Sequence, residues 1–170
     1  MRKHNGMRPQ DIVILLKIVA KGESQWQLLN LANELKISNS EISESLNRSK
    51  TANLLDFNKK LVKRQNFMEF IEHGLKYVFP QEPGTMVRGT ATAHSHPFMA
   101  AKFNSATNYV WPDENGTIMG LAIEPYYKKQ TEAVKEDGKL FKLLALTDVI
   151  RVGKTREIKT AIEELKKIIL

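Results

Sequence analysis

Residues 26–46, WQLLNLANELKISNSEISESL, constrain the fold of this chain more than any other stretch. The apolar side chains of its first half recur at helical spacing and are Leu28, Leu31, Ala32 and Leu35. Ala32 puts a small side chain where two steeply crossing helices approach each other. The stretch therefore predicts a helix, a tight turn and a second helix packed across the first.

The start of the second helix is marked by its polar residues. Ser38 is suited to cap the N-terminus, and Glu41, three residues later, is placed to reach back and complete a capping box. Ile42 and Leu46 are four residues apart and would face the core. The side chains left for solvent or a ligand are short polar or basic groups, namely Asn39, Ser40, Ser43, Glu44, Asn47, Arg48 and Lys50.

Residues 31–46, LANELKISNSEISESL, resemble the winged helix-turn-helix regulators of bacteria, most closely the MarR-like branch, whose pattern is similar to LAxxLxISxSEISxxL. The resemblance implies binding of duplex DNA with the second helix in the major groove. One position departs from the pattern. Lys36 stands where the family commonly has Gly in the turn, and a left-handed backbone there costs a non-glycine residue about 1 kcal/mol.

The flanking segments fit the same fold. Residues 9–20 predict a covering helix whose apolar residues exceed one stripe, so we expect it to be buried on two sides or to meet another subunit. Residues 53–64 predict a very small hairpin, or wing, with a turn at residues 56–59. Phe57 in this turn has no obvious partner. Basic side chains suited to backbone phosphates follow it and are Lys59, Lys60, Lys63 and Arg64, although a plain solvated basic loop remains the alternative.

Composition and charge narrow the choice of partner. The 170 residues carry a formal net charge of +7, and the positive excess lies mainly in residues 1–80, with 13 Lys and Arg against 8 Asp and Glu. This balance points to a polyanion without choosing between DNA, RNA and an acidic membrane. The chain has no cysteine, which excludes disulfides and cysteine-ligated metals. We expect a cytoplasmic protein, with no membrane partner, because no apolar run is long enough to cross a bilayer.

The chain changes character after Pro80. Residues 66–79 predict a helix with Tyr77 and Phe79 in the core, whereas residues 81–131 are rich in Pro and Gly and predict an irregular extension. Within it, residues 108–111 and 117–123 predict a β-hairpin around a strong turn signal. We expect this extension to wrap the core, contact a second subunit, or bind an unknown protein or small-molecule effector. Its large aromatics are either contact residues or anchors to the core and are Trp111, Tyr126 and Tyr127.

An enzymatic interpretation is not favoured. His94 and His96 would face the same side of a strand and could ligate a metal, but no third ligand stands at a supportive spacing. Ser95 lacks a nucleophile elbow and an identifiable acidic partner for a histidine. The sequence therefore predicts no catalytic residue, no metal and no cofactor.

The C-terminal part returns to helix over residues 139–152 and 155–170. The second of these has a clean apolar stripe, which would pair two subunits or pack within the chain, and we favour pairing. The expected fold class is mainly α with a small β component. We divide the chain into a winged helix-turn-helix domain at 1–80, the extension at 81–131 and C-terminal helices at 132–170.

These observations predict a homodimer that binds duplex DNA in a sequence-specific way and regulates transcription in bacteria. Residues 38–50, beginning at Ser38, would enter the major groove. Base edges would be met by Asn39, Ser40, Ser43, Glu44 and Asn47. Phosphates would be held by Arg48, Lys50, Lys59, Lys60, Lys63 and Arg64. The alternative is a protein-interaction or regulatory subunit that uses a winged scaffold without reading DNA.

Overall fold

The computed structural model describes residues 5–170 and is mainly helical with a small three-stranded sheet, which confirms the predicted fold class. The helices are α1 Pro9–Lys21, α2 Leu28–Leu35, α3 Asn39–Thr51, α4 Arg64–His73, α5 Leu75–Val78, the 3-10 turn η1 Ala93–Ser95, α6 Pro97–Ala100, α7 Gln130–Ala133, α8 Gly138–Val152 and α9 Thr155–Ile169. The strands are β1 Met86–Ala91, β2 Tyr109–Pro112 and β3 Ile118–Ala122.

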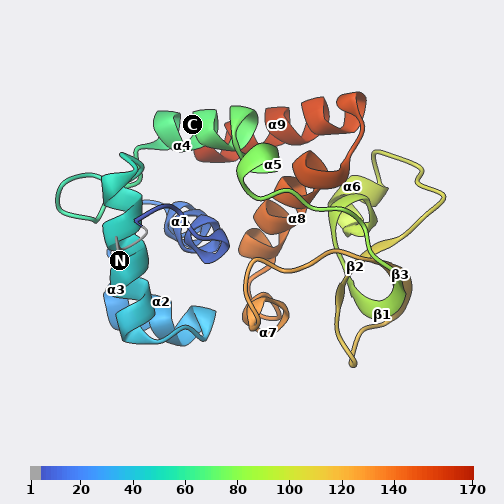
Figure 1. Ribbon diagram of the computed structural model, residues 1–170, viewed down its shortest axis with the longest axis horizontal. Helices are drawn as coiled ribbons and strands as arrows, with labels where there is room; N and C mark the ends of the chain where they lie inside the picture. The colour runs from blue at the N-terminus through green and yellow to red at the C-terminus, as the bar shows by residue number, and fades with distance from the viewer. Residues whose placement is uncertain (1–4) are drawn as a thin grey trace.

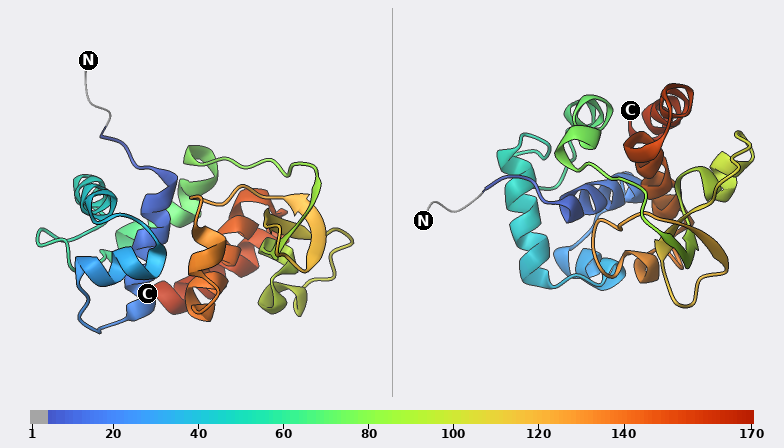
Figure 2. Two further views of the ribbon diagram at one scale, coloured as in Figure 1. Left: turned by 90° about the horizontal axis from the view of Figure 1, so that it is seen from below. Right: turned by 45° about the vertical axis from the view of Figure 1, so that its right-hand side comes forward.

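The molecule is elongated, with α2 and α3 at one end and the sheet with α6 at the other (Figure 1). Helices α1 and α8 lie between the two ends, and α4 and α9 run along one side of them (Figures 1 and 2). The buried apolar side chains form one cluster that extends from Ile12 in α1 to Ile169 in α9. The N-terminal helices therefore share their core with the C-terminal helices, and the domain boundaries stay a prediction.

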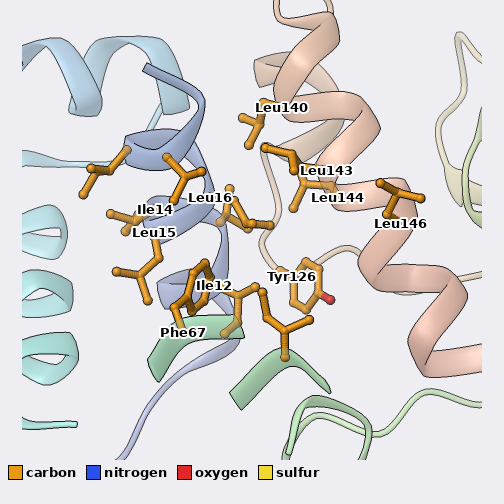
Figure 3. Packing of buried hydrophobic residues seen from close by; sticks show 14 of the residues in the cluster. Ile12, Ile14, Leu15, Leu16, Phe67, Tyr126, Leu140, Leu143, Leu144 and Leu146 are labelled. Atoms are coloured by element: carbon orange, nitrogen blue, oxygen red, sulfur yellow. The ribbon is translucent and has the colours of Figure 1, made fainter. Parts of the chain in front are cut away.

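Helices α1 and α8 form the centre of the core. Leucine and isoleucine side chains from the two helices point toward one another, with Phe67 of α4 closing one end (Figure 3). Leu144 and Leu146 lie on different faces of α8 and both are fully buried, as expected for a helix that is apolar on nearly all sides. In α1, Ile14 and Ile18 are also buried, so this helix is covered on two sides as predicted.

Helix α9 uses its apolar stripe within the chain. Ala161, Leu165 and Ile169 are fully buried where α9 packs against α8 and α4. Arg64 at the start of α4 donates a hydrogen bond from Nη1 to the carbonyl oxygen of Ile169, at 2.8 Å. The stripe that we assigned to subunit pairing is therefore occupied by intramolecular packing, and pairing of subunits stays untested.

The three strands close on themselves, and the predicted hairpin is wrong in its pairing. Strand β1 runs antiparallel to both β2 and β3, while β2 and β3 pair in parallel. The backbones cross so closely that a Cβ added at Gly89 would lie 2.1 Å from the Trp111 carbonyl oxygen, and one at Gly116 would lie 2.2 Å from the Gly89 backbone. Only glycine permits this approach, which lets the loop after β2 pass over β1.

A buried carboxylate fastens the sheet to α8. Thr92 Oγ1 and Trp111 Nε1 both donate to Asp148 Oδ2, each at 2.7 Å. Burial raises the pKa of Asp148, and its Oδ1 has no hydrogen-bond partner among the described residues. Trp111 is fully buried and Tyr126 nearly so, with its hydroxyl donating to Thr147. Both aromatics are thus anchors to the core and not contact residues.

The segment expected as one helix over residues 66–79 is divided at Gly74 into α4 and α5. The consequence is that Tyr77 is 72% exposed and Val78 51% exposed, so the prediction that Tyr77 lies in the core is wrong. Phe79 does pack against the core. Within residues 5–170, no helix has both the length and the apolar character that crossing a membrane requires.

Candidate nucleic-acid interface

The turn between α2 and α3 is built around Lys36. Its backbone is left-handed, with φ 58° and ψ 38°, and the amides of Lys36 and Ile37 both donate to the carbonyl oxygen of Ala32. Ser38 then accepts a hydrogen bond at Oγ from the amide of Glu41, at 3.2 Å, and α3 begins at Asn39. The helix-turn-helix expected from the sequence is confirmed as local structure.

The predicted capping box is wrong in one half. Ser38 caps α3, but the Glu41 carboxylate accepts a hydrogen bond from Gln10 Nε2 at 2.6 Å and lies 3.8 Å from the Arg8 guanidinium. The side chain is drawn to α1 because the first turn of α1 packs against α3. Glu41 therefore ties these two helices together and leaves the cap to Ser38.

Arg48 does not face solvent, contrary to the prediction. Its Nε donates to Asp11 Oδ2 at 2.9 Å and its Nη2 donates to Asp11 Oδ1 at 2.8 Å. Arg48 is 8% exposed and Asp11 is fully buried. The Asp11 carboxylate raises the pKa of Arg48, so the guanidinium stays charged within this bidentate pair. Arg48 fixes α3 against α1, and while the pair holds it is not placed to bind a phosphate.

The outer face of α3 keeps the other predicted polar residues at the surface. Asn39, Ser43 and Asn47 follow one another at a spacing of four, so they share one side of the helix. The inner face buries Ile42 and Leu46. In Figure 1, α3 lies at the edge of the molecule. We call the following residues the α3 face: Ser38, Asn39, Ser40, Ser43, Glu44 and Asn47.

A short hairpin beside α3 confirms the predicted wing structure, which we define as residues 55–62. Leu55 and Val62 form an isolated antiparallel bridge. Asp56 organises the turn between them, because its Oδ1 accepts from the amides of Lys60 and Leu61 at 2.7 and 2.8 Å. Burial alone would raise the pKa of Asp56, but these backbone hydrogen bonds dominate and lower it.

Two contacts join the wing to the C-terminal half of α3. Lys59 Nζ donates to Asn47 Oδ1 at 2.9 Å, and Lys50 Nζ lies 4.1 Å from the centre of the Phe57 ring. On the opposite side of the wing, Lys60 Nζ lies 4.4 Å from the centre of the Trp26 ring. The α3 face and the wing are therefore one continuous polar and basic surface.

The remaining predicted phosphate ligands are only partly available. Lys63 is exposed, and its Nζ donates to Asn53 Oδ1. Arg64 is half-buried and uses its guanidinium on the C-terminal end of α9, as described above. The structure thus places Lys50 and Lys59 beside the α3 face, and Lys60 on the opposite side of the wing. Arg48 and Arg64 are structural.

The histidines that suggested a metal site are separately engaged. His94 Nε2 lies 2.7 Å from Glu157 Oε2, whereas the ring of His96 meets the edge of Phe141 at 4.5 Å between centres. Ser95 Oγ accepts from the amide of Tyr109 at 2.9 Å. Within residues 5–170, no group of three or more His, Cys, Asp or Glu side chains is arranged to hold a metal ion.

Sequence reasoning missed the part that Phe57 plays at this surface. Its ring is 81% exposed, the highest value among the large apolar side chains of residues 5–170. The available signal was an aromatic residue inside a turn that is otherwise polar and basic. Asp11 also carried a signal, as a carboxylate directly before an unbroken apolar run in the first helix.

Comparisons with known proteins identify no relative of this chain. A scan against protein-family models, a search of curated proteins and a search of solved structures each found no match. The function of this chain is therefore inferred from α3, the wing and the contacts between them.

Proposed function

We propose that this chain binds duplex DNA by placing the α3 face in the major groove and the wing lysines on the flanking phosphates. The observation that carries the proposal is the junction at Asn47, where the residue best suited to read a base edge is hydrogen-bonded to Lys59 of the wing. Asn pairs with adenine in the major groove through its amide, and Lys pairs with phosphate as a point charge. On binding, this hydrogen bond would open and each partner would take its own DNA ligand.

The local charges support a polyanionic ligand. Lys50 ends the exposed part of α3, and Lys59 and Lys60 lie in the wing; within residues 5–170, none of the three forms an ion pair with a carboxylate. Neutralising phosphates releases counterions from DNA, which is the main source of affinity for such a surface. Because Arg48 is withdrawn into the core, the proposal assigns phosphate contacts to lysines alone.

The proposal extends to a bacterial transcriptional regulator that acts in the cytoplasm as a homodimer. A dimer would present two copies of α3 to a two-fold related site. Since the stripe of α9 is buried within the chain, the dimer surface would have to use other groups. Sedimentation equilibrium tests this part: we expect a dimer, and a monomer at all concentrations would contradict it.

The experiment for DNA binding is a fluorescence anisotropy titration with a labelled duplex of mixed sequence, repeated over a series of salt concentrations. The logarithm of the association constant K should fall linearly with the logarithm of the salt concentration, with a slope of about −0.9 for each phosphate neutralised. Lys60→Ala should reduce that slope by about 1 unit. The matched control is Lys159→Ala, which removes an exposed lysine from α9 and should leave the slope unchanged.

Asn47→Ala tests the major-groove assignment separately. It removes a base-reading group but no charge, so we expect weaker binding to a selected site and unchanged binding to mixed-sequence duplex. If wild-type protein shows no salt-dependent binding to duplex DNA, the proposal is wrong and the winged part serves as a scaffold for protein contacts. Equal effects of Lys60→Ala and Lys159→Ala would place the interface elsewhere.

A further inference from the structure

The wing carries apolar groups where a phosphate-binding loop needs none. Phe57 is 81% exposed and Leu61, in the return arm of the same hairpin, is 70% exposed. Single exposed apolar residues are common on protein surfaces. Here, however, two of them occur together on a hairpin of eight residues whose other exposed side chains are polar or basic.

Phe57 is also held in a defined position. The Lys50 ammonium group of α3 lies 4.1 Å from the centre of the ring, a cation–π distance. The preceding residue, Asp56, accepts the amide hydrogens of Lys60 and Leu61 and so fixes the turn. The ring is therefore oriented before any ligand binds, and the residue that orients it belongs to the proposed recognition helix.

The charges around Phe57 fit one occupant. Lys50 lies against the ring of this apolar tip, and Lys59 and Lys60 belong to the same hairpin. A wing beside a helix in the major groove would meet the adjacent minor groove. Proteins that enter the minor groove place basic side chains on its phosphates and insert an apolar side chain between base pairs. Charge complementarity and the apolar tip thus point to the same ligand.

We propose that Phe57 is an insertion residue, which enters the minor groove of duplex DNA and wedges between base pairs at a flexible pyrimidine–purine step. This inference rests on the proposed function and adds to it the mode of contact and a source of sequence preference. A duplex bound in this way is kinked toward the major groove, and the flexible steps TA and CA are kinked most easily.

The test measures affinity and DNA bending together, with a mixed-sequence duplex labelled at both ends for energy transfer. Phe57→Ala should weaken binding about tenfold, as expected for loss of a contact of about 1.4 kcal/mol, and should abolish the bend. The slope of log K against log salt should stay unchanged, because no phosphate contact is removed. Phe57→Leu keeps an apolar wedge and should retain most of the bend.

The chain offers a close control in Tyr77, an aromatic residue of α5 that is 72% exposed and has Lys76 Nζ 5.0 Å from its ring centre. Tyr77→Ala should leave affinity and bend unchanged. If wild-type protein binds DNA with a salt-dependent affinity but Phe57→Ala binds and bends equally well, the insertion is wrong while the proposed function stands. A wild-type complex with straight DNA also overturns the insertion, and absence of salt-dependent binding overturns the proposed function itself.

Discussion

The Asp11–Arg48 pair should dominate the stability of the winged part, and replacing Arg48 by Met tests this. The substitution keeps the unbranched side chain but removes the charge. It leaves a fully buried carboxylate that loses hydrogen bonds of 2.9 and 2.8 Å and keeps the one from the Arg8 amide, also at 2.8 Å. Removing one partner of a buried pair typically costs about 3–5 kcal/mol.

We expect Arg48→Met to lower the free energy of unfolding by about 3 kcal/mol, the low end of that range, because Asp11 also lies in the first turn of α1 where the helix dipole favours it. For a chain of this length, the loss corresponds to a fall in Tm of roughly 6–12 °C. Urea unfolding followed by circular dichroism measures it. Arg156→Met, at an exposed position of α9, is the matched control and should change stability by less than about 0.5 kcal/mol.

A double-mutant cycle with Asp11→Asn separates the pair from the single residues. The two single substitutions should each destabilise the protein strongly, and the double variant should lose much less than their sum, because it leaves no unpaired charge in the core. Arg48→Met and Arg156→Met with equal effects would refute the reasoning. Strictly additive effects of Asp11→Asn and Arg48→Met would refute it equally.

Three further predictions concern the turn, the wing and pH. Lys36→Gly should raise the free energy of unfolding by about 1 kcal/mol, because φ is 58° there, and a thermal melt checks it. Asp56→Ala removes the acceptor of the amides of residues 60 and 61, so hydrogen exchange of these amides should become faster. The loosened wing should bind duplex DNA more weakly, with little change in Tm. Burial, aided by the charge of Lys142, lowers the pKa of His96 from 6.5 to about 4. The neutral His96 side chain therefore contributes to the free energy of unfolding above pH 6.5, and this contribution is lost as pH falls through 4. His96→Asn keeps an acceptor for the Phe98 amide. Urea titrations should show that this variant loses less stability than the wild type over that pH interval.

Local signals predicted α2, α3 and the turn of the wing well. Helical periodicity, the Ser38 cap and the turn residues each act within a few positions of the chain, so the sequence determines α2, α3 and the wing turn directly. The C-terminal helices were predicted for the same reason. Their bounds, Gly138–Val152 and Thr155–Ile169, differ from the expectation by one residue at one end of each helix.

Contacts between distant segments could not be predicted in this way. Arg48 lies at a position that periodicity assigns to the polar side of α3, and it is buried because Asp11, 37 residues earlier, meets it in the core. The sheet is a second case. The Asn115–Gly116 signal predicts a turn, but the pairing is decided by β1 and by the close crossing at Gly89, for which no local pattern exists.

The most direct measurement of the central claim is a map of amide chemical shifts in isotope-labelled protein as mixed-sequence duplex DNA is added. The account predicts that the perturbed amides fall in residues 38–50 and in the wing, with the Asn47 side-chain amide among them as its hydrogen bond to Lys59 opens. Amides of α5, α8 and the sheet should stay unperturbed. Perturbations confined to those elements, or no perturbation at moderate salt, would contradict DNA binding by α3 and the wing.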